Sequence, residues 1–452
     1  MEVFGSSGAR GIAGTELTPG FVLQVAEAAG TVWEADRAAV ATDTRQTGRM
    51  FADATAAGLA GVGLDVDRLG ITPTPAIGRY CEQEAIPGVV LTASHNPPEY
   101  NGVKLIGADG IELSVDRLER IEAHALSEEF DAVPWDLVGE SREVDTANET
   151  YVDALLAAVD TDRIADAELT VALDPGHGAG ALVSPDFYRE LGCEVVTVNA
   201  QLDGHFPGRL PEPVPENLGD LGELVRAADA DVGIAHDGDA DRSVFFDETG
   251  TFIDGDASLA ALAERELSAG DHTVAAVNVS QRLVDVCERV DAELELTPIG
   301  ATHIITRIKE LWTAGESVPI AGEGNGGVFF PDHRLVRDGP YIGAKFLELI
   351  ADRPASEVIA PYQDYHNERI NLAYGSEAER RTMLSAAEAF VHEADADIST
   401  IDGYRLDYGD SWVLVRPSGT EPKIRIVAEA TTADRADSLA GELADVVRAA
   451  VE

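Results

Sequence analysis

Asp231-Val232-Gly233-Ile234-Ala235 is followed, after His236, by Asp237-Gly238-Asp239-Ala240-Asp241-Arg242. The apolar run predicts a buried strand, which delivers three carboxylates at alternate positions with only small residues between them. Hard divalent cations prefer carboxylate oxygens, and Mg²⁺ usually keeps waters and a phosphate group in the rest of its shell. The stretch therefore predicts a strand that ends in a metal-binding loop, with a bound phosphoryl group as the expected partner.

Two other interpretations of the acidic stretch are weaker. Four acidic residues stand at the first, third, fifth and twelfth positions of an EF-hand calcium loop: Asp237, Asp239, Asp241 and Glu248. However, Arg242 stands where that loop needs glycine, and Ser243-Val244-Phe245-Phe246 predicts a strand where a calcium-binding helix would continue. A chance run of aspartates on a solvated surface would not need small residues between the carboxylates or a buried strand before them.

The chain is strongly acidic. Its 452 residues include 82 Asp and Glu against 33 Lys and Arg, for a formal net charge of -49. Such a surface repels nucleic acid and anionic membranes, so neither is an expected partner. The same balance suits a halophile, because a Debye length of about 3 Å at molar salt mutes repulsion between the carboxylates. We expect the few basic residues to gather where an anionic substrate binds.

The cysteines and the N-terminus predict a soluble cytoplasmic protein. Cys81, Cys193 and Cys287 are isolated and lack metal-ligand spacing, which indicates a reducing compartment and no disulfide framework or zinc site. The first residues lack the basic segment and apolar core of a signal peptide, and no stretch approaches the roughly 18 consecutive apolar residues of a membrane helix.

Short β-rich runs alternate with helical Ala/Leu/Glu/Arg patterns, which predicts an α/β architecture with largely parallel sheets. The clearest predicted strands are 38–42, 88–91, 169–173, 231–235, 272–277 and 318–321. The chain is predicted to have four domains: 1–148, 149–252, 253–365 and 366–452. The boundaries are only weakly marked, and the first precedes a helix expected from Tyr151. The last domain has predicted helices over 378–393 and 433–451 and strands over 412–415 and 424–429.

The loops that follow strands in such sheets are the expected ligand-binding segments. Thr92-Ala93-Ser94-His95-Asn96-Pro97 follows the predicted strand 88–91, with Lys104 close behind, and places Ser94 as a nucleophile beside a base, an amide and a cation. Gly322-Glu323-Gly324-Asn325-Gly326-Gly327 follows another strand and carries a carboxylate and a carboxamide that suit sugar hydroxyls.

Two further loops carry arginines. Arg416-Pro417-Ser418-Gly419-Thr420-Glu421-Pro422 combines a guanidinium, two hydroxyls and a glycine amide, and Arg425 adds a second guanidinium fork. Because such forks bind phosphate through two hydrogen bonds, this loop predicts a phosphate cradle. Gly5-Ser6-Ser7-Gly8-Ala9-Arg10-Gly11 is a weaker signal, a small-residue loop with one arginine that suits either a disordered terminus or a lid over an anion.

In this order, the loops resemble those of the α-D-phosphohexomutase superfamily, which includes phosphoglucomutases, phosphomannomutases and phosphoglucosamine mutases. The resemblance covers the whole chain, with 92–97, 237–242, 322–327 and 416–422 similar to that family's phosphoserine, metal, sugar and phosphate loops. It implies three related α/β domains with mixed, largely parallel sheets plus a smaller α+β C-terminal domain around a central cleft. The fourth domain is expected to hinge.

The resemblance also implies a mechanism. Ser94, phosphorylated at rest, would give its phosphoryl group to one end of a hexose phosphate, and the hexose 1,6-bisphosphate, which also serves as activator, would turn around before the other end returns a phosphate. The implied ligands of Mg²⁺ are phospho-Ser94, Asp237, Asp239 and Asp241. The residues implied around the transferred phosphate are Arg10, His95, Lys104 and Arg242, with His95 or Lys104 as acid or base. The implied substrate contacts are Glu323, Asn325, Arg416, Ser418, Gly419, Thr420 and Arg425.

The sugar loop departs from the common family pattern. Asn325-Gly326-Gly327 stands where many members carry Ser-Gly-His, a variant that resembles archaeal members and favours a phosphoglucosamine mutase. A phosphomannomutase or phosphoglucomutase is the alternative, and a Mg²⁺-dependent sugar phosphatase with an aspartate nucleophile is the rival enzyme class. A non-enzymatic calcium-binding or structural role is a third hypothesis. We expect a small-molecule hexose phosphate as the partner of a monomer or homodimer.

Overall fold

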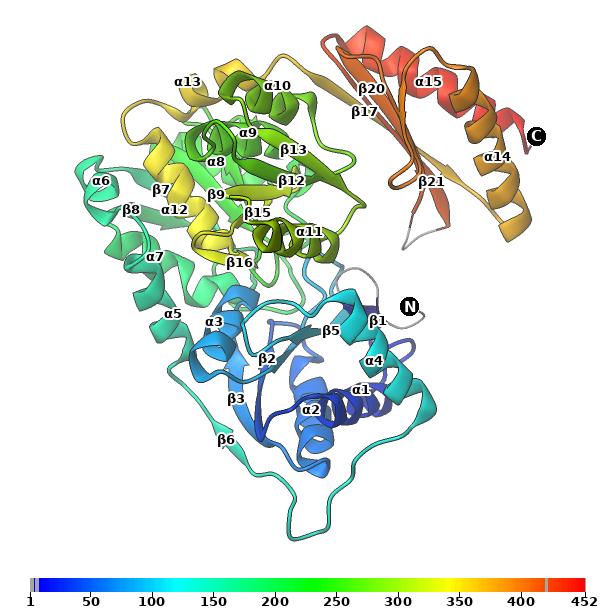
Figure 1. The fold of residues 1–452 in the computed structure, drawn as a ribbon. Coiled ribbons are helices and arrows are strands. Elements are labelled where there is room, and N and C mark those ends of the chain that lie inside the picture. The colour runs from blue at the N-terminus through cyan, green and yellow to red at the C-terminus, as the bar shows by residue number, and fades with distance from the viewer. Residues whose placement is uncertain (1–3, 5–7, 419–421, 452) are drawn as a thin grey trace. The chain divides into compact units, whose positions relative to one another are not determined.

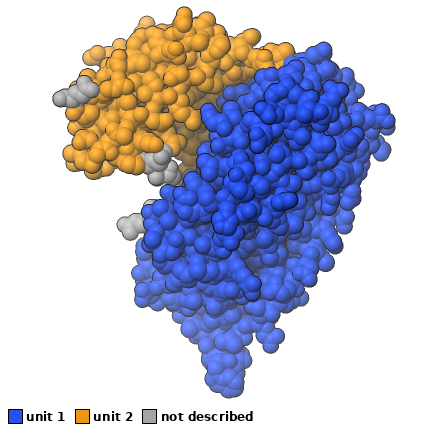
Figure 2. Space-filling model, turned by 180° about the vertical axis from the view of Figure 1, so that it is seen from behind, with its two compact units in different colours: residues 1–258, 325–358 blue, residues 259–324, 359–452 orange. Residues whose placement is uncertain are grey.

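The computed structural model describes residues 4, 8–418 and 422–451. The chain forms two compact units, residues 1–258 with 325–358 and residues 259–324 with 359–452, which Figure 2 colours separately. Gly419 and Thr420 of the predicted phosphate loop lie outside the described residues. Among the helices of the described ranges, none combines the length and apolar character needed to cross a lipid bilayer.

The first sheet has the strand order β1-β5-β4-β2-β3-β6 (Figure 1). Its strands are β1 (Ala9–Ile12), β2 (Arg37–Thr42), β3 (Asp65–Ile71), β4 (Gly88–Leu91), β5 (Tyr100–Ile106) and β6 (Ser141–Glu143). The pairs β2–β3, β2–β4 and β3–β6 are parallel, whereas β5 runs antiparallel to β4 and β1. The mixed, largely parallel sheet that we expected is therefore present.

Helices cover both faces of this sheet because side chains alternate along its central strands. Ala38 and Val40 of β2 belong to one apolar cluster and Ala39 and Ala41 to the other. The first cluster packs under α1 (Pro19–Val32), α2 (Gly48–Gly61) and α4 (Val115–Ser127). The second packs under α3 (Thr74–Glu84) and the start of α5 (Ala147–Leu156).

The expected start of the helix at Tyr151 is wrong, because α5 begins at Ala147. Ala147 is buried in the second cluster, so the first turn has an apolar anchor. Glu149 in that turn faces the positive end of the helix dipole. Asn148, Glu149 and Thr150, which we expected to precede the helix, therefore belong to it.

The second sheet has the strand order β11-β10-β9-β7-β8. Its strands are β7 (Thr170–Asp174), β8 (Glu194–Thr197), β9 (Val232–His236), β10 (Ser243–Phe246) and β11 (Phe252–Ile253), and its helices are α6 (Thr161–Asp166), α7 (Ser184–Glu190) and α8 (Gly219–Ala228). β7 pairs in parallel with β8 and β9, and β10 pairs antiparallel with β9. The remaining elements of this unit are β15 (Gly327–Phe330), β16 (Arg334–Arg337), α12 (Gly339–Ile350) and α13 (Ala355–Ile359).

The second unit begins within α9 (Gly255–Glu266) and contains a third set of parallel strands. The elements are β12 (His272–Ala276), α10 (Gln281–Val290), β13 (Glu293–Thr297), α11 (Ala301–Ala314) and β14 (Ile320–Glu323). β12 pairs in parallel with β13 and with β14. The carboxyl end of β14 therefore carries the predicted sugar-binding residue Glu323.

The C-terminal sheet has the order β17-β21-β20-β19-β18 and is antiparallel throughout. Its elements are β17 (His366–Ala373), α14 (Glu377–Glu393), β18 (Asp397–Ser399), β19 (Tyr404–Asp407), β20 (Ser411–Pro417), β21 (Lys423–Ala430) and α15 (Ala433–Ala449). Val413 and Val415 of β20 pack under the two helices, whereas Trp412 and Leu414 on the opposite face contact Val277 after β12. The expectation of three α/β domains followed by a smaller α+β domain is confirmed, and the central cleft stays a prediction.

A buried charged cluster joins the C-terminal sheet to the segment after β12. Glu429 of β21 is fully buried and accepts hydrogen bonds from the Gln281 backbone N–H at 2.6 Å and the Trp412 indole at 3.1 Å. The Arg282 guanidinium lies 3.1 Å from the same carboxylate. Arg405 donates to the carbonyl oxygen of Val277 at 2.6 Å. The polar atoms therefore orient an interface whose apolar part is the Trp412 face of the sheet.

Candidate active site

The three aspartates lie in the connection between β9 and β10. The antiparallel register places Ser243 opposite His236, so residues 237–242 form the whole connection. All three carboxylates are buried, with at most 1 % of each residue exposed. A Cβ at Gly238 would lie 2.7 Å from the Ser94 carbonyl oxygen, so glycine allows the loop to approach the Ser94 backbone.

The residues of this loop fit a divalent cation. Each aspartate offers an oxygen, and these ligand atoms all lie within 4.8 Å of one another. The Oδ1 atom of each aspartate is buried and has no hydrogen-bond partner among the described residues. Because an unpartnered buried carboxylate oxygen is costly, and because hard cations prefer oxygen donors, the cluster suits Mg²⁺ or a similar ion.

Ser94 lies directly beside this cluster. Its hydroxyl donates a hydrogen bond to Asp237 Oδ2 at 2.6 Å, across 143 residues of sequence. Its backbone has a positive φ of 50°, which costs a non-glycine residue about 1–3 kcal/mol and is typical of functional sites. The Ser94 backbone N–H donates to Thr92 Oγ1 at 2.9 Å. The structure thus brings together the predicted nucleophile and the predicted metal ligands.

Arg45, which the sequence analysis missed, anchors the serine loop. Its buried guanidinium donates to four carbonyl oxygens of that loop and the strand after it: Ser94, Asn96, Pro97 and Tyr100. Asp43 holds the arginine through a 3.0 Å ion pair and accepts a 2.6 Å hydrogen bond from Thr92. The signal was available, because Asp43-Thr44-Arg45 follows a predicted strand in a chain with few basic residues.

Thr74 and Arg337 were also missed. Thr74 donates through its hydroxyl to Asp239 Oδ2 at 2.6 Å and through its backbone N–H to the Asp239 carbonyl at 3.0 Å. Arg337, the last residue of β16, donates to Asp241 Oδ2 at 2.5 Å. Both residues follow or end a strand, but their distance in sequence from the aspartates concealed the contact.

Lys104 is a buried cation within the acidic cluster. Its Nζ atom lies 3.2 Å from Asp239 Oδ2 and 3.0 Å from Asp241 Oδ2. Burial opposes its charge, yet the two carboxylates outweigh burial and raise the pKa of Lys104 above its ordinary value. Burial likewise opposes ionisation of Asp241, but Arg337 and Lys104 hold the pKa of that carboxyl far below its usual range. Lys104 is therefore an ammonium ion here.

Asp237 is the carboxyl of the cluster that resists ionisation. Burial is the main cause, and the neighbouring Asp241 and Asp239 carboxylates add to it, so that the pKa of Asp237 is raised well above its ordinary value. A divalent cation held by the three carboxylates would offset that repulsion. The cluster thus contains a carboxyl whose ionisation its protein neighbours do not favour.

His95 and the two predicted arginines flank Ser94. Arg242 Nη2 lies 3.0 Å from His95 Nδ1, and the same ring nitrogen lies 3.4 Å from Ser94 Oγ. Burial and the nearby Arg242 lower the pKa of His95, so the imidazole is neutral and accepts at Nδ1. Arg10 donates to Asn96 Oδ1 at 2.9 Å. These residues therefore lie in one cluster with Ser94 and the aspartates.

The predicted sugar loop is divided between the two units. Glu323 ends β14 in the second unit and is buried, whereas Asn325 belongs to the first. The Asn325 side-chain oxygen accepts from the Gly327 N–H at 3.0 Å. Ser243, just after the aspartates, donates its backbone N–H to Gly326 at 3.0 Å, and a Cβ at Gly326 would lie 2.5 Å from the Ser243 oxygen. The Asn325 side of the loop therefore lies beside the metal loop.

The predicted phosphate loop places two arginines side by side. Arg416 of β20 stands directly opposite Arg425 of β21. Like charges at opposed positions of an antiparallel pair destabilise it unless another charge intervenes. Asp402 lies 3.0 Å from Arg416, whose Nε atom is buried and has no hydrogen-bond partner among the described residues. The Ser418 N–H donates to the Lys423 carbonyl at 2.8 Å, which closes the base of the loop.

Comparison with protein families matches four consecutive models along the chain. The first three are phosphoglucomutase/phosphomannomutase alpha/beta/alpha domains I, II and III, over residues 1–132, 149–250 and 254–365. The fourth is the C-terminal domain of the same group, over residues 372–446.

Curated relatives and solved structures extend over nearly the whole chain. A Methanopyrus kandleri protein named probable phosphoglucosamine mutase is 40% identical, with 99% of this chain and 98% of that protein covered. A Thermococcus kodakarensis phosphoglucomutase/phosphomannomutase is also 40% identical, with 96% of each chain covered. A Burkholderia thailandensis phosphoglucomutase/phosphomannomutase family crystal structure has a TM-score of 0.85 at 27% identity, with 99% of this chain and 97% of that chain covered.

Proposed function

The chain belongs to the phosphoglucomutase/phosphomannomutase family and is a phosphohexomutase, and we propose that glucosamine phosphate is the hexose phosphate it prefers. The observation that carries the chemistry is the 2.6 Å hydrogen bond from the Ser94 hydroxyl to Asp237 within the buried aspartate cluster. The sugar preference is supported by Asn325-Gly326-Gly327 and by the name of the Methanopyrus kandleri relative. Mannose phosphate or glucose phosphate is the second candidate substrate, supported by the name of the Thermococcus kodakarensis relative.

In the proposed reaction, Ser94 Oγ and a sugar oxygen exchange one phosphoryl group. The bond from phosphorus to Oγ breaks as the bond to a substrate hydroxyl forms, and the bisphosphate then returns its other phosphoryl group to Oγ after turning around. The hydroxyl that attacks must lose a proton, and the oxygen that leaves must gain one. The neutral His95 is an acceptor near Ser94, and the charged Lys104 is a donor near the aspartates.

The electrostatic part of the mechanism rests on the cations around Ser94. Lys104, Arg242 and Arg10 place positive charge where a phosphoryl group on Ser94 would carry negative charge. Asp237, Asp239 and Asp241 would hold Mg²⁺, which when bound supplies charge neutralisation for the transferred group. Arg45 does not contact the substrate in this proposal but keeps the Ser94 backbone in its left-handed conformation through the carbonyl contacts.

Two further loops would bind the part of the substrate that does not react. Arg416, Ser418 and Arg425 are proposed to bind its phosphate, and Glu323 with Asn325 to bind ring hydroxyls. Hexose 1,6-bisphosphate is the proposed activator, because it restores the phosphate on Ser94.

Four domains with the boundaries 148/149, 252/253 and 365/366 are proposed for the chain, supported by the ranges of the four family segments. We also propose that the protein works in a salt-rich cytoplasm. The net charge of -49 and the three buried free cysteines support that setting.

The test of the proposed function is turnover of three substrates in concentrated KCl. Glucosamine 1-phosphate should be converted to its 6-phosphate with a higher kcat/KM than glucose 1-phosphate or mannose 1-phosphate. Chelation should abolish turnover and Mg²⁺ should restore it. A higher kcat/KM for glucose 1-phosphate or mannose 1-phosphate would overturn the proposed preference for glucosamine phosphate. Release of inorganic phosphate without isomerisation would support the phosphatase hypothesis.

Replacing Arg416 with glutamine should raise KM for the hexose phosphate by about tenfold or more, because a charge-assisted phosphate contact is lost. Arg416 forms an ion pair with Asp402 and lies near the loop end of β20, so the melting temperature should change little. The measurement is steady-state kinetics with a thermal melt. An unchanged KM together with a lower melting temperature would contradict the phosphate cradle.

A further inference from the structure

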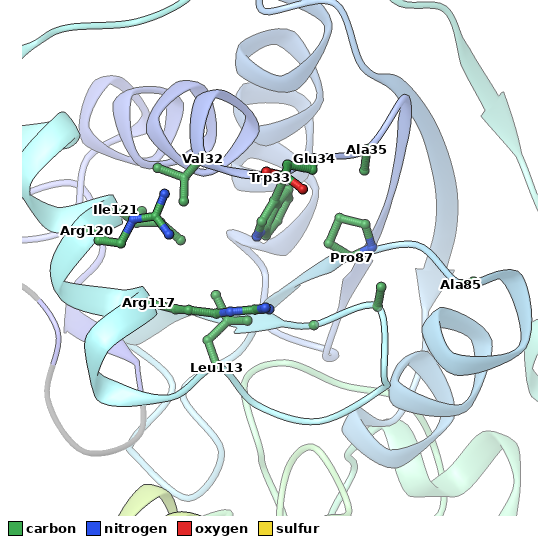
Figure 3. Close-up of a pocket in the computed structure, with 12 residues that line it drawn as sticks. Val32, Trp33, Glu34, Ala35, Ala85, Pro87, Leu113, Arg117, Arg120 and Ile121 are labelled. Carbon is green, nitrogen blue, oxygen red and sulfur yellow. The ribbon is translucent and has the colours of Figure 1, made fainter.

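A cavity of about 350 Å³ opens in the first α/β segment, between the ends of helices and the ends of strands β4 and β5 (Figure 3). Pro87 and Gly107 line it, and they flank the end of the β4–β5 pair where Gly88 stands opposite Ile106. Ser94 follows the other end of β4. The cavity and the aspartate cluster therefore lie at opposite ends of the same strand.

Two arginines of α4 line this cavity. Arg117 and Arg120 are three residues apart, so they lie on one face of the helix. Among the residues that the structure describes, neither takes part in an ion pair or a side-chain hydrogen bond. Two neighbouring cations without acidic partners are unexpected in a chain of net charge -49. The pair is therefore suited to an anionic group supplied from outside the chain.

Trp33 supplies the second observation. Its indole Nε1 is buried and has no hydrogen-bond partner among the described residues. Figure 3 shows the indole across the cavity from Arg117, with its nitrogen edge toward the guanidinium and the Pro87 ring beside it. A solvated helix face explains two exposed arginines, but it does not explain a buried N–H donor without a partner. An indole and a guanidinium on opposite walls suit a flat ring between them.

Residues at the ends of two helices also line the cavity. Helix α1 ends at Val32 and α3 ends just before Ala85, and the last turn of a helix presents carbonyl oxygens without intrahelical partners. Glu34 is also a lining residue. A ligand here would need N–H donors at one end and a negative charge at the other.

We propose that this cavity is a second ligand site, separate from the catalytic centre, for a nucleoside monophosphate. The flat base would lie between Trp33 and Arg117, its amino group would face the carbonyl oxygens, and the phosphate would bind Arg117 and Arg120. The volume of about 350 Å³ falls within the range of about 300–1,000 Å³ usual for small-molecule sites. The proposal does not depend on which sugar the catalytic centre turns over.

The test is fluorine NMR of the full chain labelled with fluorotryptophan, because the protein has only four tryptophans. The Trp33→Phe variant assigns the Trp33 resonance. Adenosine monophosphate should shift that resonance saturably, and the double variant R117Q/R120Q should weaken the binding by at least about tenfold. The control R189Q/R448Q removes two exposed arginines outside the cavity and should leave the affinity unchanged.

Two further titrations separate the parts of the ligand. Adenosine and inorganic phosphate should each bind at least about tenfold more weakly than adenosine monophosphate, because each fills only half of the site. The proposal would be overturned if adenosine or inorganic phosphate alone bound as tightly as adenosine monophosphate. It would also be overturned if adenosine monophosphate did not shift the Trp33 resonance. Unchanged affinity in R117Q/R120Q would also overturn it, and the melting temperature of that variant shows whether it is folded.

Discussion

Replacement of Ser94 with alanine should reduce mutase turnover by at least about 10³-fold, the scale seen when an enzyme loses its covalent nucleophile. The reason is that Ser94 Oγ is the hydroxyl that lies 2.6 Å from Asp237 in the buried cluster, and alanine removes it. The measurement is conversion of a hexose 1-phosphate to the 6-phosphate, with peptide mass spectrometry of the resting enzyme. The wild-type protein should carry an acid-stable phosphate on Ser94.

The matched control for this prediction is Ser141→Ala, because Ser141 of β6 is exposed. That variant should keep full activity and the phosphate on Ser94. Turnover that survives in Ser94→Ala would contradict the proposed mechanism. An acid-labile phosphate on an aspartate of 237–241 would instead support the sugar phosphatase.

Replacement of Glu429 with alanine should lower the free energy of opening of the C-terminal sheet by about 3–5 kcal/mol, the usual cost of removing one partner of a buried ion pair. Glu429 is fully buried, and its loss would leave the Arg282 guanidinium and the Trp412 indole without their shared acceptor. Native-state hydrogen exchange of the β20 and β21 amides measures this local stability.

The control for that prediction is Glu393→Ala, at the exposed end of α14, which should change the same quantity by less than about 0.5 kcal/mol. A double-mutant cycle with Arg282→Met should show coupling between Glu429 and Arg282. If the β20 and β21 amides of the Glu429→Ala variant exchange at the wild-type rate, the buried cluster does not hold the sheet to the segment after β12.

Periodicity and composition were sufficient for most of the fold. The buried strands were predicted within one or two residues of β2, β4, β7, β9, β12 and β14, because an uninterrupted apolar run of four to six residues is typical of a strand covered on both faces. The start of α5 was wrong because polar residues are tolerated on the exposed side of a first helical turn. The two helices of the C-terminal domain were predicted within two residues of their bounds, and in the structure each follows a capping residue, Ser376 or Thr432.

The catalytic loops could be recognised because their chemistry is local. Three carboxylates at alternate positions, or a serine after a buried strand, are visible in a window of six residues. Arg45, Thr74 and Arg337 could not be connected to those loops in the same way, because each contacts a residue 49 or more positions away in sequence. Long-range contacts of this kind are set by how the strands are ordered in the sheets.

The sequence by itself determined the strands, the loops that end them and the residue types that can bind a metal and phosphate, because these properties depend on near neighbours. Only the tertiary structure decided which charges meet. Lys104 is held as a cation because folding places it beside Asp239 and Asp241, and Asp237 resists ionisation because folding removes it from water. The same folding leaves Trp33, Arg117 and Arg120 around one cavity, which no spacing along the chain indicates.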